Sequence, residues 1–270
     1  MSYDYTGFKI EDIFSVKGKV ALVTGGSSGL GLNMAHALVR NGCKVYVSSR
    51  KQKQCDAAVK ELSAHGEAIA IACDASKVAN IEALVAELTK REPNGIHICI
   101  ANAGATWGHE FDTMPEEAYD KVMNLNVRSV FYTIQKMLPL LEKAGTAADP
   151  ARVIATGSVA GVRVSGPTVT PYSTSKAAVH HMMRNLALAL GPRHITCNSI
   201  APGYFPSKMT AGTLSGREDE VSAGNPLGRL GLPLDIAAVA LWLCGRGGQY
   251  VNGVTIPLDG GESLGAASKI

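Results

Sequence analysis

The sequence predicts a single α/β domain whose parallel sheet is doubly wound, with helices on both faces. Three observations predict this class. Short apolar segments of strand length alternate with segments of helical spacing, which is typical of βαβ crossovers. Glycine is frequent, with 29 of 270 residues, and spread along the chain; 46% of the residues are hydrophobic and 18% charged. No change in composition marks a second domain, and the length fits one large α/β unit.

Seven segments are predicted as strands because they are almost continuously apolar, as in a sheet buried on both faces. In chain order they cover residues 19–24, 44–49, 68–73, 96–100, 152–156, 195–199 and 254–258. Helical spacing follows the first strand, from Leu30 to Leu38, and appears again at 52–64 and 233–245. The last of these helices is apolar nearly all round, which predicts burial in the core or at a subunit interface.

Three regions fall outside this alternation. Residues 1–18 are expected to form an N-terminal arm over the surface, so that the dinucleotide-binding and catalytic domain covers 19–270. Residues 144–151 are expected to form a loop between a helix and a strand. Residues 203–232 are rich in Gly, Pro, Ser and charge, and a loop of this length favours a substrate lid.

Charge and cysteine content exclude several function classes. The net charge of +3 is too small to indicate a nucleic-acid or membrane partner. The 6 cysteines have no metal-ligand spacing, so we expect buried, inert thiols and no metal site. Without a signal peptide or a membrane span, a cytoplasmic address is expected. The final Ser268-Lys269-Ile270 approximates a peroxisomal signal, which has meaning only in a eukaryote.

A glycine-rich turn follows the first strand and opens the first helix. It reads Thr24-Gly-Gly-Ser-Ser-Gly-Leu-Gly31, with glycines at 25, 29 and 31. Such glycines let the backbone approach a pyrophosphate, which then lies on the helix N-terminus. The alternative is an ordinary tight turn between strand and helix.

The end of the second strand selects the dinucleotide. It reads Ser48-Ser49-Arg50-Lys51, with no carboxylate for a ribose hydroxyl and with a guanidinium suited to a 2′-phosphate. NADP is therefore expected, the alternative being a solvated basic strand end. After the third strand, Asp74 is placed to accept from the adenine amino group or else to cap the next helix.

Tyr172 and Lys176 lie four residues apart in a helical run, so they share one face. A nearby ammonium stabilises a phenolate, and we expect it to lower the pKa of Tyr172 towards neutrality. This spacing also occurs by chance, but Ser158 and Asn102 each follow a buried strand, where open α/β sheets bind ligands. Asn126 lies inside an apolar helical run, either for a catalytic reason or as a satisfied core amide.

Together these residues resemble the short-chain dehydrogenase/reductase family over nearly all of 19–261, which implies a Rossmann fold. The branch that the chain resembles is that of the NADPH-dependent 3-oxoacyl reductases of the rhamnolipid-synthesis type. The matching motifs are Thr24-Gly-x3-Gly-x-Gly31, Asn102-Ala-Gly104, Asn126, Ser158, Tyr172-x3-Lys176, Asn198-x3-Pro202-Gly203 and Leu258-Asp-Gly-Gly261. Two positions depart from the family: Ala101 stands where a second Asn is common, and Ser28 where a basic residue is common in NADP enzymes.

The resemblance implies a role for each catalytic residue. Tyr172 protonates the carbonyl oxygen, Ser158 holds that oxygen, and Lys176 lowers the tyrosine pKa and binds the nicotinamide ribose. Asn126 positions a water that links Lys176 to solvent, and Ser207 or Thr210 reaches the nicotinamide carboxamide or phosphate. The cofactor set implied is Gly25, Ser27, Ser28, Gly29, Leu30, Gly31, Arg50, Lys51, Asp74, Ala75, Asn102, Ala103, Gly104, Tyr172, Lys176, Pro202, Gly203, Phe205 and Ser207.

The expected activity is NADPH-dependent reduction of a ketone, with a 3-oxoacyl thioester, a polyketide-type ketone and an alicyclic ketone left open. Reduction of a carbon–carbon double bond and a non-redox scaffold or sensor are the rival interpretations. The family also implies a homotetramer (or homodimer). Candidate substrate residues are Trp107, His109, Val162, Arg163, Tyr204 and Met209, of which His109 and Arg163 are equally well explained as solvated loop residues.

Overall fold

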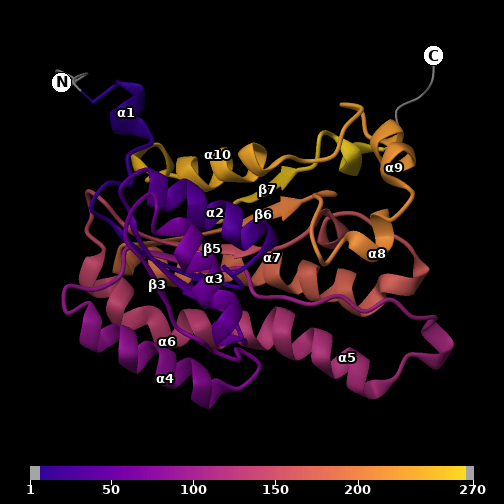
Figure 1. Ribbon diagram of the computed structural model, residues 1–270, viewed down its shortest axis with the longest axis horizontal. Coiled ribbons are helices and arrows are strands. Elements are labelled where there is room, and N and C mark those ends of the chain that lie inside the picture. Colours follow the sequence, from indigo (N-terminus) through magenta and orange to yellow (C-terminus); the bar gives the residue numbers. More distant parts are fainter. Residues whose placement is uncertain (1–6, 266–270) are drawn as a thin grey trace.

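The computed structural model describes residues 7–265, which fold around one seven-stranded sheet (Figure 1). The strand order is β3-β2-β1-β4-β5-β6-β7, and all neighbours are parallel. The predicted fold class and its seven strands are confirmed. The strands are β1 (Val20–Thr24), β2 (Lys44–Ser48), β3 (Ala68–Ala70), β4 (Ile98–Ala101), β5 (Ala151–Thr156), β6 (Ile195–Pro202) and β7 (Thr255–Leu258).

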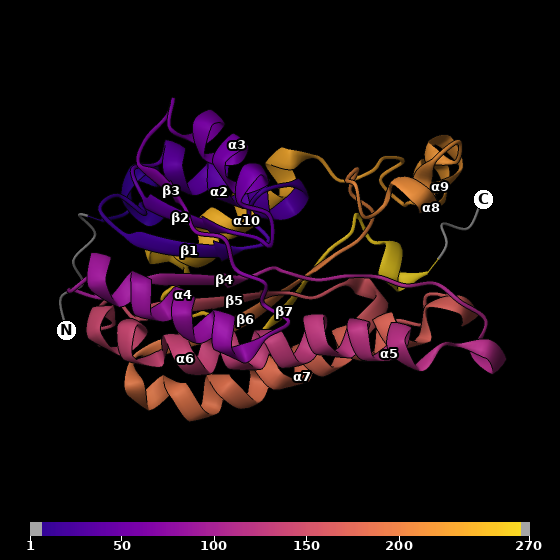
Figure 2. The same cartoon turned by 60° about the horizontal axis from the view of Figure 1, so that its bottom comes forward.

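Helices cover both faces of the sheet, with α4, α5, α6 and α7 on one side and α2, α3 and α10 on the other (Figure 2). The α-helices are α1 (Ile10–Ile13), α2 (Gly29–Arg40), α3 (Gln52–Leu62), α4 (Val78–Arg91), α5 (Glu116–Met123), α6 (Ser129–Ala144), α7 (Thr170–Leu190), α8 (Ala211–Leu214), α9 (Glu218–Gly224) and α10 (Pro233–Cys244). The shorter turns are η1 (Phe111–Thr113), the π-helix η2 (Asn124–Arg128), η3 (Val159–Gly161), η4 (Pro167–Val169), η5 (Gly191–Arg193), η6 (Arg246–Gly248) and η7 (Glu262–Leu264).

The core consists of two apolar layers, one on each face of the sheet, because successive strand side chains point in opposite directions. Leu22, Cys99 and Val153 pack with α6 and α7, whereas Val23 and Ile100 pack with α2 and α10. This two-sided burial explains why the strands are apolar at almost every position. As the sequence predicts, all six cysteines are buried.

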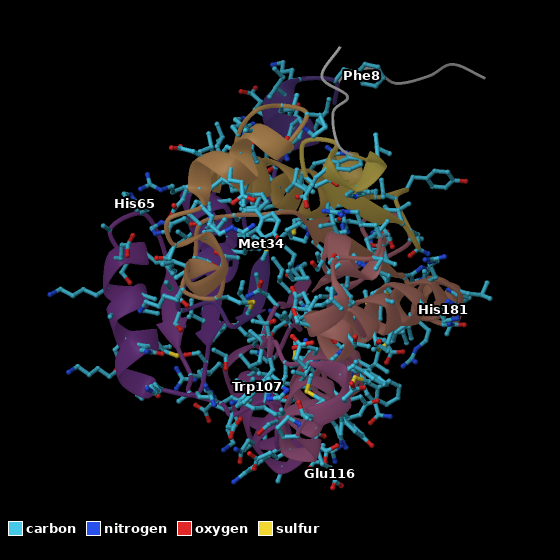
Figure 3. All side chains as sticks on the ribbon, turned by 90° about the vertical axis from the view of Figure 1, so that its right-hand side faces the viewer. Phe8, Met34, His65, Trp107, Glu116 and His181 are labelled. Atoms are coloured by element: carbon cyan, nitrogen blue, oxygen red, sulfur yellow. The ribbon has the colours of Figure 1, made fainter. Side chains whose placement is uncertain are left out.

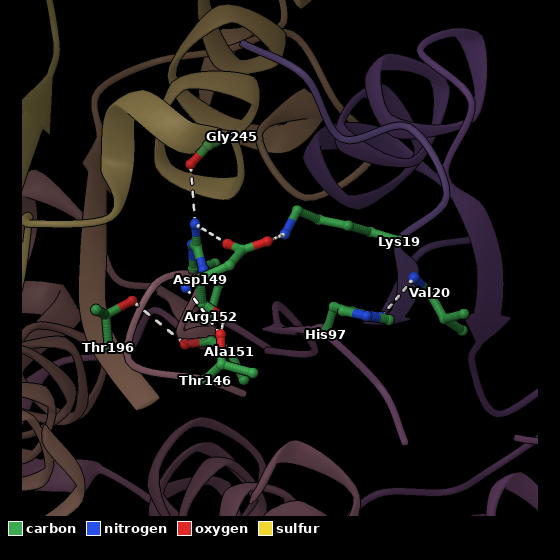
Figure 4. A network of polar contacts seen from close by, with 9 residues as sticks. All are labelled: Lys19, Val20, His97, Thr146, Asp149, Ala151, Arg152, Thr196 and Gly245. Carbon is green, nitrogen blue, oxygen red and sulfur yellow. Dashed lines mark hydrogen bonds and ion pairs between the residues drawn. The ribbon is translucent and has the colours of Figure 1, made fainter. Parts of the chain in front are cut away.

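A polar network lies at the amino edge of the sheet, where the strands begin (Figure 4). The Lys19 ammonium is 2.5 Å from Oδ2 of Asp149, and the Arg152 guanidinium is 2.8 Å from Oδ1 of the same carboxylate. Arg152 is 1% exposed and also donates to the carbonyl oxygen of Gly245, which follows α10. Asp149 thus ties the loop before β5 to two cations, one of which anchors the end of α10.

Several expectations differ from the structure in detail. The segment 203–232 is not irregular throughout, because it contains α8 and α9. The helix α10 buries Ile236 fully, whereas Leu234 is 75% exposed in the single chain, so the expected burial of this side at a subunit interface stays a prediction. In the N-terminal segment, α1 is followed by Val16, which is fully buried. The tripeptide 268–270 lies outside the described residues, and no helix within 7–265 is long and apolar enough to span a membrane.

Candidate active site

A single cleft of about 370 Å³ runs along the carboxyl edge of the sheet, from the end of β2 to the first turns of α7. The sequence places these two ends more than a hundred residues apart, and the parallel strands bring them together. The predicted site residues that line the cleft are Gly25, Ser27, Ser28, Gly29, Leu30, Arg50, Lys51, Ala75, Asn102, Ala103, Gly104, Ser158, Tyr172, Lys176, Pro202, Gly203, Phe205, Ser207, Met209 and Thr210.

The glycine-rich turn has the backbone that the sequence predicts. Gly25 and Gly29 have φ of 65° and 55°, in the left-handed region that favours glycine. Asn102 holds this turn, since its Nδ2 donates to the carbonyl oxygens of Thr24 and Gly25. A Cβ on Gly31 would lie 2.4 Å from the same Nδ2, so Gly31 serves packing behind the turn and does not line the cleft.

The end of β2 presents cations and hydroxyls to the cleft. Arg50 and Lys51 line it, and within residues 7–265 neither forms an ion pair. Ser27 donates to Oγ of Ser49 over 2.9 Å, and Ser49 lines the cleft although our sequence-based set omitted it. Its position directly after a strand end, beside Arg50, was a usable signal.

Asp74 is engaged in the turn before α4. Its Oδ1 accepts from the backbone N–H and the hydroxyl of Ser76, at 3.2 and 2.8 Å, in the turn before α4. Asp74 is also absent from the residues that line the cleft. Its role in the structure is therefore close to the alternative interpretation, a carboxylate that stabilises the approach to the next helix.

Tyr172 and Lys176 lie one turn apart on α7, at the far end of the cleft. The Lys176 ammonium is 5.6 Å from the centre of the Tyr172 ring and donates to the carbonyl oxygen of Thr156 over 2.8 Å. Lys176 is 5% exposed, and its burial lowers the pKa of its ammonium to about 8. Ser158 begins the 3₁₀ turn η3, where its Oγ accepts from the N–H of Ala160.

We expected the pKa of Tyr172 to be lowered, but the chain's own residues raise it, so this expectation is wrong. Burial raises this pKa above its ordinary value, although a hydrogen bond with Ser158 works in the opposite direction. The ammonium of Lys176 donates to the carbonyl oxygen of Thr156. Burial of the phenol is therefore the largest influence on the pKa of Tyr172. Tyr172 therefore keeps its proton at neutral pH.

Asn126 lies in the π-helix between α5 and α6, and it is 1% exposed. Its amide donates to the carbonyl oxygen of Ala105 and to Oγ of Ser175, both at 2.9 Å, and its Oδ1 accepts from Ala105. A Cβ on Gly104 would lie 3.1 Å from this Oδ1 and 3.5 Å from Nζ of Lys176, so Asn126 is close behind the catalytic lysine. Its water-positioning role remains a prediction.

Of the six candidate substrate residues, only Met209 lines the cleft. Trp107 lies against α5, with Nζ of Lys121 at 4.9 Å from its ring (Figure 3). Arg163 forms an ion pair with Glu262, a residue that the sequence did not single out. Also outside the lining of the cleft are His109, Val162 and Tyr204. Tyr204 lines a separate cavity of about 180 Å³.

A glycine-rich turn, unpaired cations and a Ser–Tyr–Lys group in one cleft define a dinucleotide-binding oxidoreductase. Comparison with known proteins specifies the family. The family model for enoyl-(acyl carrier protein) reductase matches residues 25–263. The rhamnolipids biosynthesis 3-oxoacyl-[acyl-carrier-protein] reductase of Pseudomonas aeruginosa is 42% identical over 253 residues, 93% of this chain and 98% of that protein. The chain belongs to the short-chain dehydrogenase/reductase family.

Two further comparisons agree. The solved structure of the Pseudomonas aeruginosa RhlG/NADP active-site complex superimposes with a TM-score of 0.90 at 42% identity, covering 94% of this chain and 99% of that one. Trihydroxynaphthalene reductase PfmaI of Pestalotiopsis fici is 35% identical over 263 residues, 91% of this chain and 90% of that protein. The resemblance predicted from the motifs is confirmed.

Proposed function

We propose that this chain is an NADP(H)-dependent carbonyl reductase that interconverts a ketone and a secondary alcohol. The observation that carries this proposal is the continuous cleft that joins the cations of Arg50 and Lys51 to Tyr172 and Lys176. The length of the cleft along the strand ends suits a dinucleotide with its phosphate-bearing end at β2 and its reactive ring at α7. The similarity to the RhlG/NADP complex supports the same cofactor.

The residues at the glycine-rich turn fit the dinucleotide. The first turn of α2 has no side-chain cap, so its backbone N–H groups are available to a pyrophosphate. Gly25 lets the turn pack closely against the segment after β4, because a Cβ there would lie 2.9 Å from Nδ2 of Asn102. When bound, NADP(H) supplies or accepts the hydride. Arg50 and Lys51 hold the 2′-phosphate.

The protein's own side chains provide the proton chemistry. Tyr172, whose burial raises its pKa, holds the proton that it gives to the carbonyl oxygen as that oxygen gains negative charge. Ser158 donates a hydrogen bond to the same oxygen and stabilises the charge. Lys176, with a pKa near 8, provides a positive charge that favours the phenolate after the proton has left.

The carbonyl assignment is favoured over reduction of a carbon–carbon double bond, which the description of the matching family model names. A hydroxyl at Ser158 beside a phenol at Tyr172 offers two hydrogen-bond donors to one oxygen. Reduction of a conjugated carbon–carbon double bond leaves the carbonyl in the product and places the proton on carbon, whereas a phenol that shares one oxygen with a serine hydroxyl is placed to leave its proton on that oxygen. The relatives named as 3-oxoacyl and trihydroxynaphthalene reductases also favour a ketone.

The test is NADPH oxidation across a ketone panel that includes 3-oxoacyl thioesters and polycyclic ketones. We expect turnover of at least one ketone and a loss of about 10³-fold in kcat for Tyr172→Phe, which lacks the proton donor. Tyr250→Phe, at a fully exposed position, is the matched control. NADPH binding with no ketone turned over, or full activity in Tyr172→Phe, would reject the proposal.

The cofactor assignment has its own test. Arg50→Ala should weaken NADPH binding by about 10-fold or more, because a charge-assisted hydrogen bond to the phosphate is lost, while NADH binding changes little. Titration calorimetry of both nucleotides measures this difference. Equal effects on the two nucleotides would remove Arg50 from the 2′-phosphate site.

We also propose that the chain forms a homotetramer through the exposed side of α10. Leu234 on that helix and Leu232 just before it are 75% and 51% exposed, and a partner subunit would cover this apolar surface. Light scattering of the purified chain decides between tetramer, dimer and monomer.

A further inference from the structure

A third side chain follows Tyr172 and Lys176 along the same line of α7. His180 lies four residues after Lys176, hence one further turn along the helix. It is 2% exposed, and its ring lies between α7 and the loop that carries Ser158. The proposed chemistry uses Tyr172 and Lys176 on this face of α7 and gives the buried imidazole of His180 no role.

Both ring nitrogens of His180 have close partners. Nε2 is 2.9 Å from the carbonyl oxygen of Ser158, and Nδ1 is 2.9 Å from Oγ of Ser199 on β6. A carbonyl oxygen only accepts, so this short contact assigns the proton to Nε2; the backbone N–H of Ser158 approaches the same nitrogen only at 3.5 Å, too long to outweigh it. In the neutral ring, Nδ1 then accepts from the hydroxyl of Ser199, which in turn lies 3.0 Å from Oγ1 of Thr255 on β7. A chain of hydrogen bonds therefore joins Ser158 to β7, the outermost strand on this side of the sheet.

The loop around Ser158 is shaped to accept this ring. A Cβ on Gly157 would lie 2.0 Å from Cε1 of His180, and a Cβ on Gly161 would lie 2.9 Å from its Cδ2. These glycines stand on either side of Ser158 in the chain. No other residue type fits at Gly157 while the imidazole keeps its place, so loop and ring are packed as one unit.

Burial also determines the charge of the ring. It lowers the pKa of His180, and the positive charges of Lys176 and Arg184 lower it further, although the hydrogen bond to Ser158 opposes them. The ring is therefore neutral at physiological pH, as the hydrogen-bond pattern requires.

We propose that His180 is a positioning residue for Ser158, which it holds through an Nε2–H hydrogen bond while Ser199 fixes its tautomer. This inference rests on the proposed carbonyl reduction. His180 touches neither the substrate nor the cofactor; it fixes the backbone that aims the Ser158 hydroxyl. Because a displacement of about 1 Å costs on the order of 100-fold in rate, a buried support of this kind controls turnover.

The kinetic test is a double-mutant cycle with ketone and NADPH. His180→Leu should lower kcat about 30-fold and leave the Kd for NADPH within twofold, whereas His180→Gln, which keeps an N–H donor, should retain most of the activity. In a Ser158→Ala background the His180→Leu change should cost less than threefold, because it acts through the Ser158 hydroxyl. Equal losses in both backgrounds overturn the proposal.

Two controls separate this role from a general loss of structure. His181→Gln changes the neighbouring histidine, which is exposed (Figure 3), and should leave kcat and the melting temperature unchanged. His180→Leu leaves the Ser158 carbonyl unpaired and is prone to misfold. If it misfolds, His180→Gln still tests the proposal, because its N–H donor should preserve the activity. A His180→Gln enzyme that is folded yet as slow as Ser158→Ala also overturns the proposal.

A spectroscopic test does not depend on activity. In the ¹⁵N-histidine-labelled protein, two-bond ¹H–¹⁵N correlations should show His180 neutral and protonated at Nε2, and Ser199→Ala should shift its Nδ1 resonance. An Nδ1–H tautomer or a charged ring overturns the positioning proposal. A wild-type chain that reduces no ketone, but shows the Nε2–H tautomer, rejects the proposed function and leaves the assigned contacts of His180 standing.

Discussion

The two edges of the sheet each bury a lysine, and they treat its charge differently. At the amino edge, Lys19 is 8% exposed and pairs with Asp149, which Arg152 shares (Figure 4). At the carboxyl edge, Lys176 is 5% exposed and donates to a backbone carbonyl, and no carboxylate within residues 7–265 forms an ion pair with it. The protein thus neutralises the buried cations that serve the fold and leaves the one at the cleft free to act on its surroundings.

The pKa shifts follow from this difference. Burial by itself would raise the pKa of Asp149, but hydrogen bonds and charge from Lys19 and Arg152 lower it below its ordinary value. Burial of Lys176 meets no such compensation and lowers its pKa to about 8. A cation held in this way is costly for stability and useful for catalysis, a combination expected at functional sites.

The largest expected effect is on turnover. Lys176→Met removes the positive charge beside Tyr172, so the phenolate left after proton transfer loses its stabilisation, and kcat should fall about 10³-fold. Lys19→Met removes an equally buried lysine at the other edge and should leave kcat within twofold. Steady-state kinetics at saturating NADPH measures both. Comparable losses in the two variants would show that the edges do not differ in function.

A smaller effect is expected on stability at the amino edge. Asp149→Asn leaves Lys19 and Arg152 without their carboxylate and should lower the free energy of unfolding by about 2 kcal/mol. This value lies below the usual cost of breaking a buried pair because the Asp149 side chain is 41% exposed and water screens it. Urea denaturation at pH 7 measures the difference, and kcat of the folded variant should be unchanged.

We also expect the stability difference between wild type and Asp149→Asn to depend on pH. The native pKa of Asp149 is below the ordinary 3.8, so its contribution is fully present above about pH 4 and is lost as pH falls through the lower native value. Wild type and Asp149→Asn should therefore converge in stability only in strong acid. A difference that stayed constant down to pH 2 would show that the carboxylate charge is not what stabilises this edge.

The sequence predicted those parts of the molecule that depend on local patterns. The strands, the glycine-rich turn and the spacing of Tyr172 and Lys176 are each encoded within a few neighbouring residues. Contacts between distant segments were not predictable: Asp149 lies 130 residues from Lys19, and Glu262 lies 99 residues from Arg163. The direction of the Tyr172 pKa failed for the same reason, because it depends on burial and on where Lys176 points.

His180 illustrates the limit most clearly. In the sequence it is the first of two adjacent histidines in a helical run, where a satisfied core residue is the ordinary interpretation. Its placement behind Ser158 emerges only when α7 is packed against β5 and β6, since its partners are Ser158, which follows β5, and Ser199 on β6. The glycines that make room for the ring gave no separate signal, because glycine next to a strand end is equally expected beside a cofactor.

The smallest expected effect is on stability at the carboxyl edge, where Lys176→Met removes the buried charge. Because the native pKa of Lys176 is about 8 and its ordinary value is 10.5, the charged form is disfavoured by folding, by about 3 kcal/mol. Lys176→Met relieves this cost but leaves the carbonyl oxygen of Thr156 without its donor, which costs about 1–3 kcal/mol. The variant should therefore be more stable than wild type at pH 7 by only about 1 kcal/mol.

The pH dependence shows whether Lys176→Met gains stability by removing a buried charge or by packing better than lysine. The unfolded chain binds the lysine proton more tightly than the native one, so the cost is present below pH 8 and disappears as pH rises towards 10.5. The stability advantage of Lys176→Met over wild type should shrink over that interval and reverse near its upper end, where only the lost hydrogen bond remains. Denaturation midpoints at pH 7 and pH 10 measure it. A variant less stable than wild type at pH 7 would mean that Lys176 is compensated in the fold, and the two edges would then treat their lysines alike.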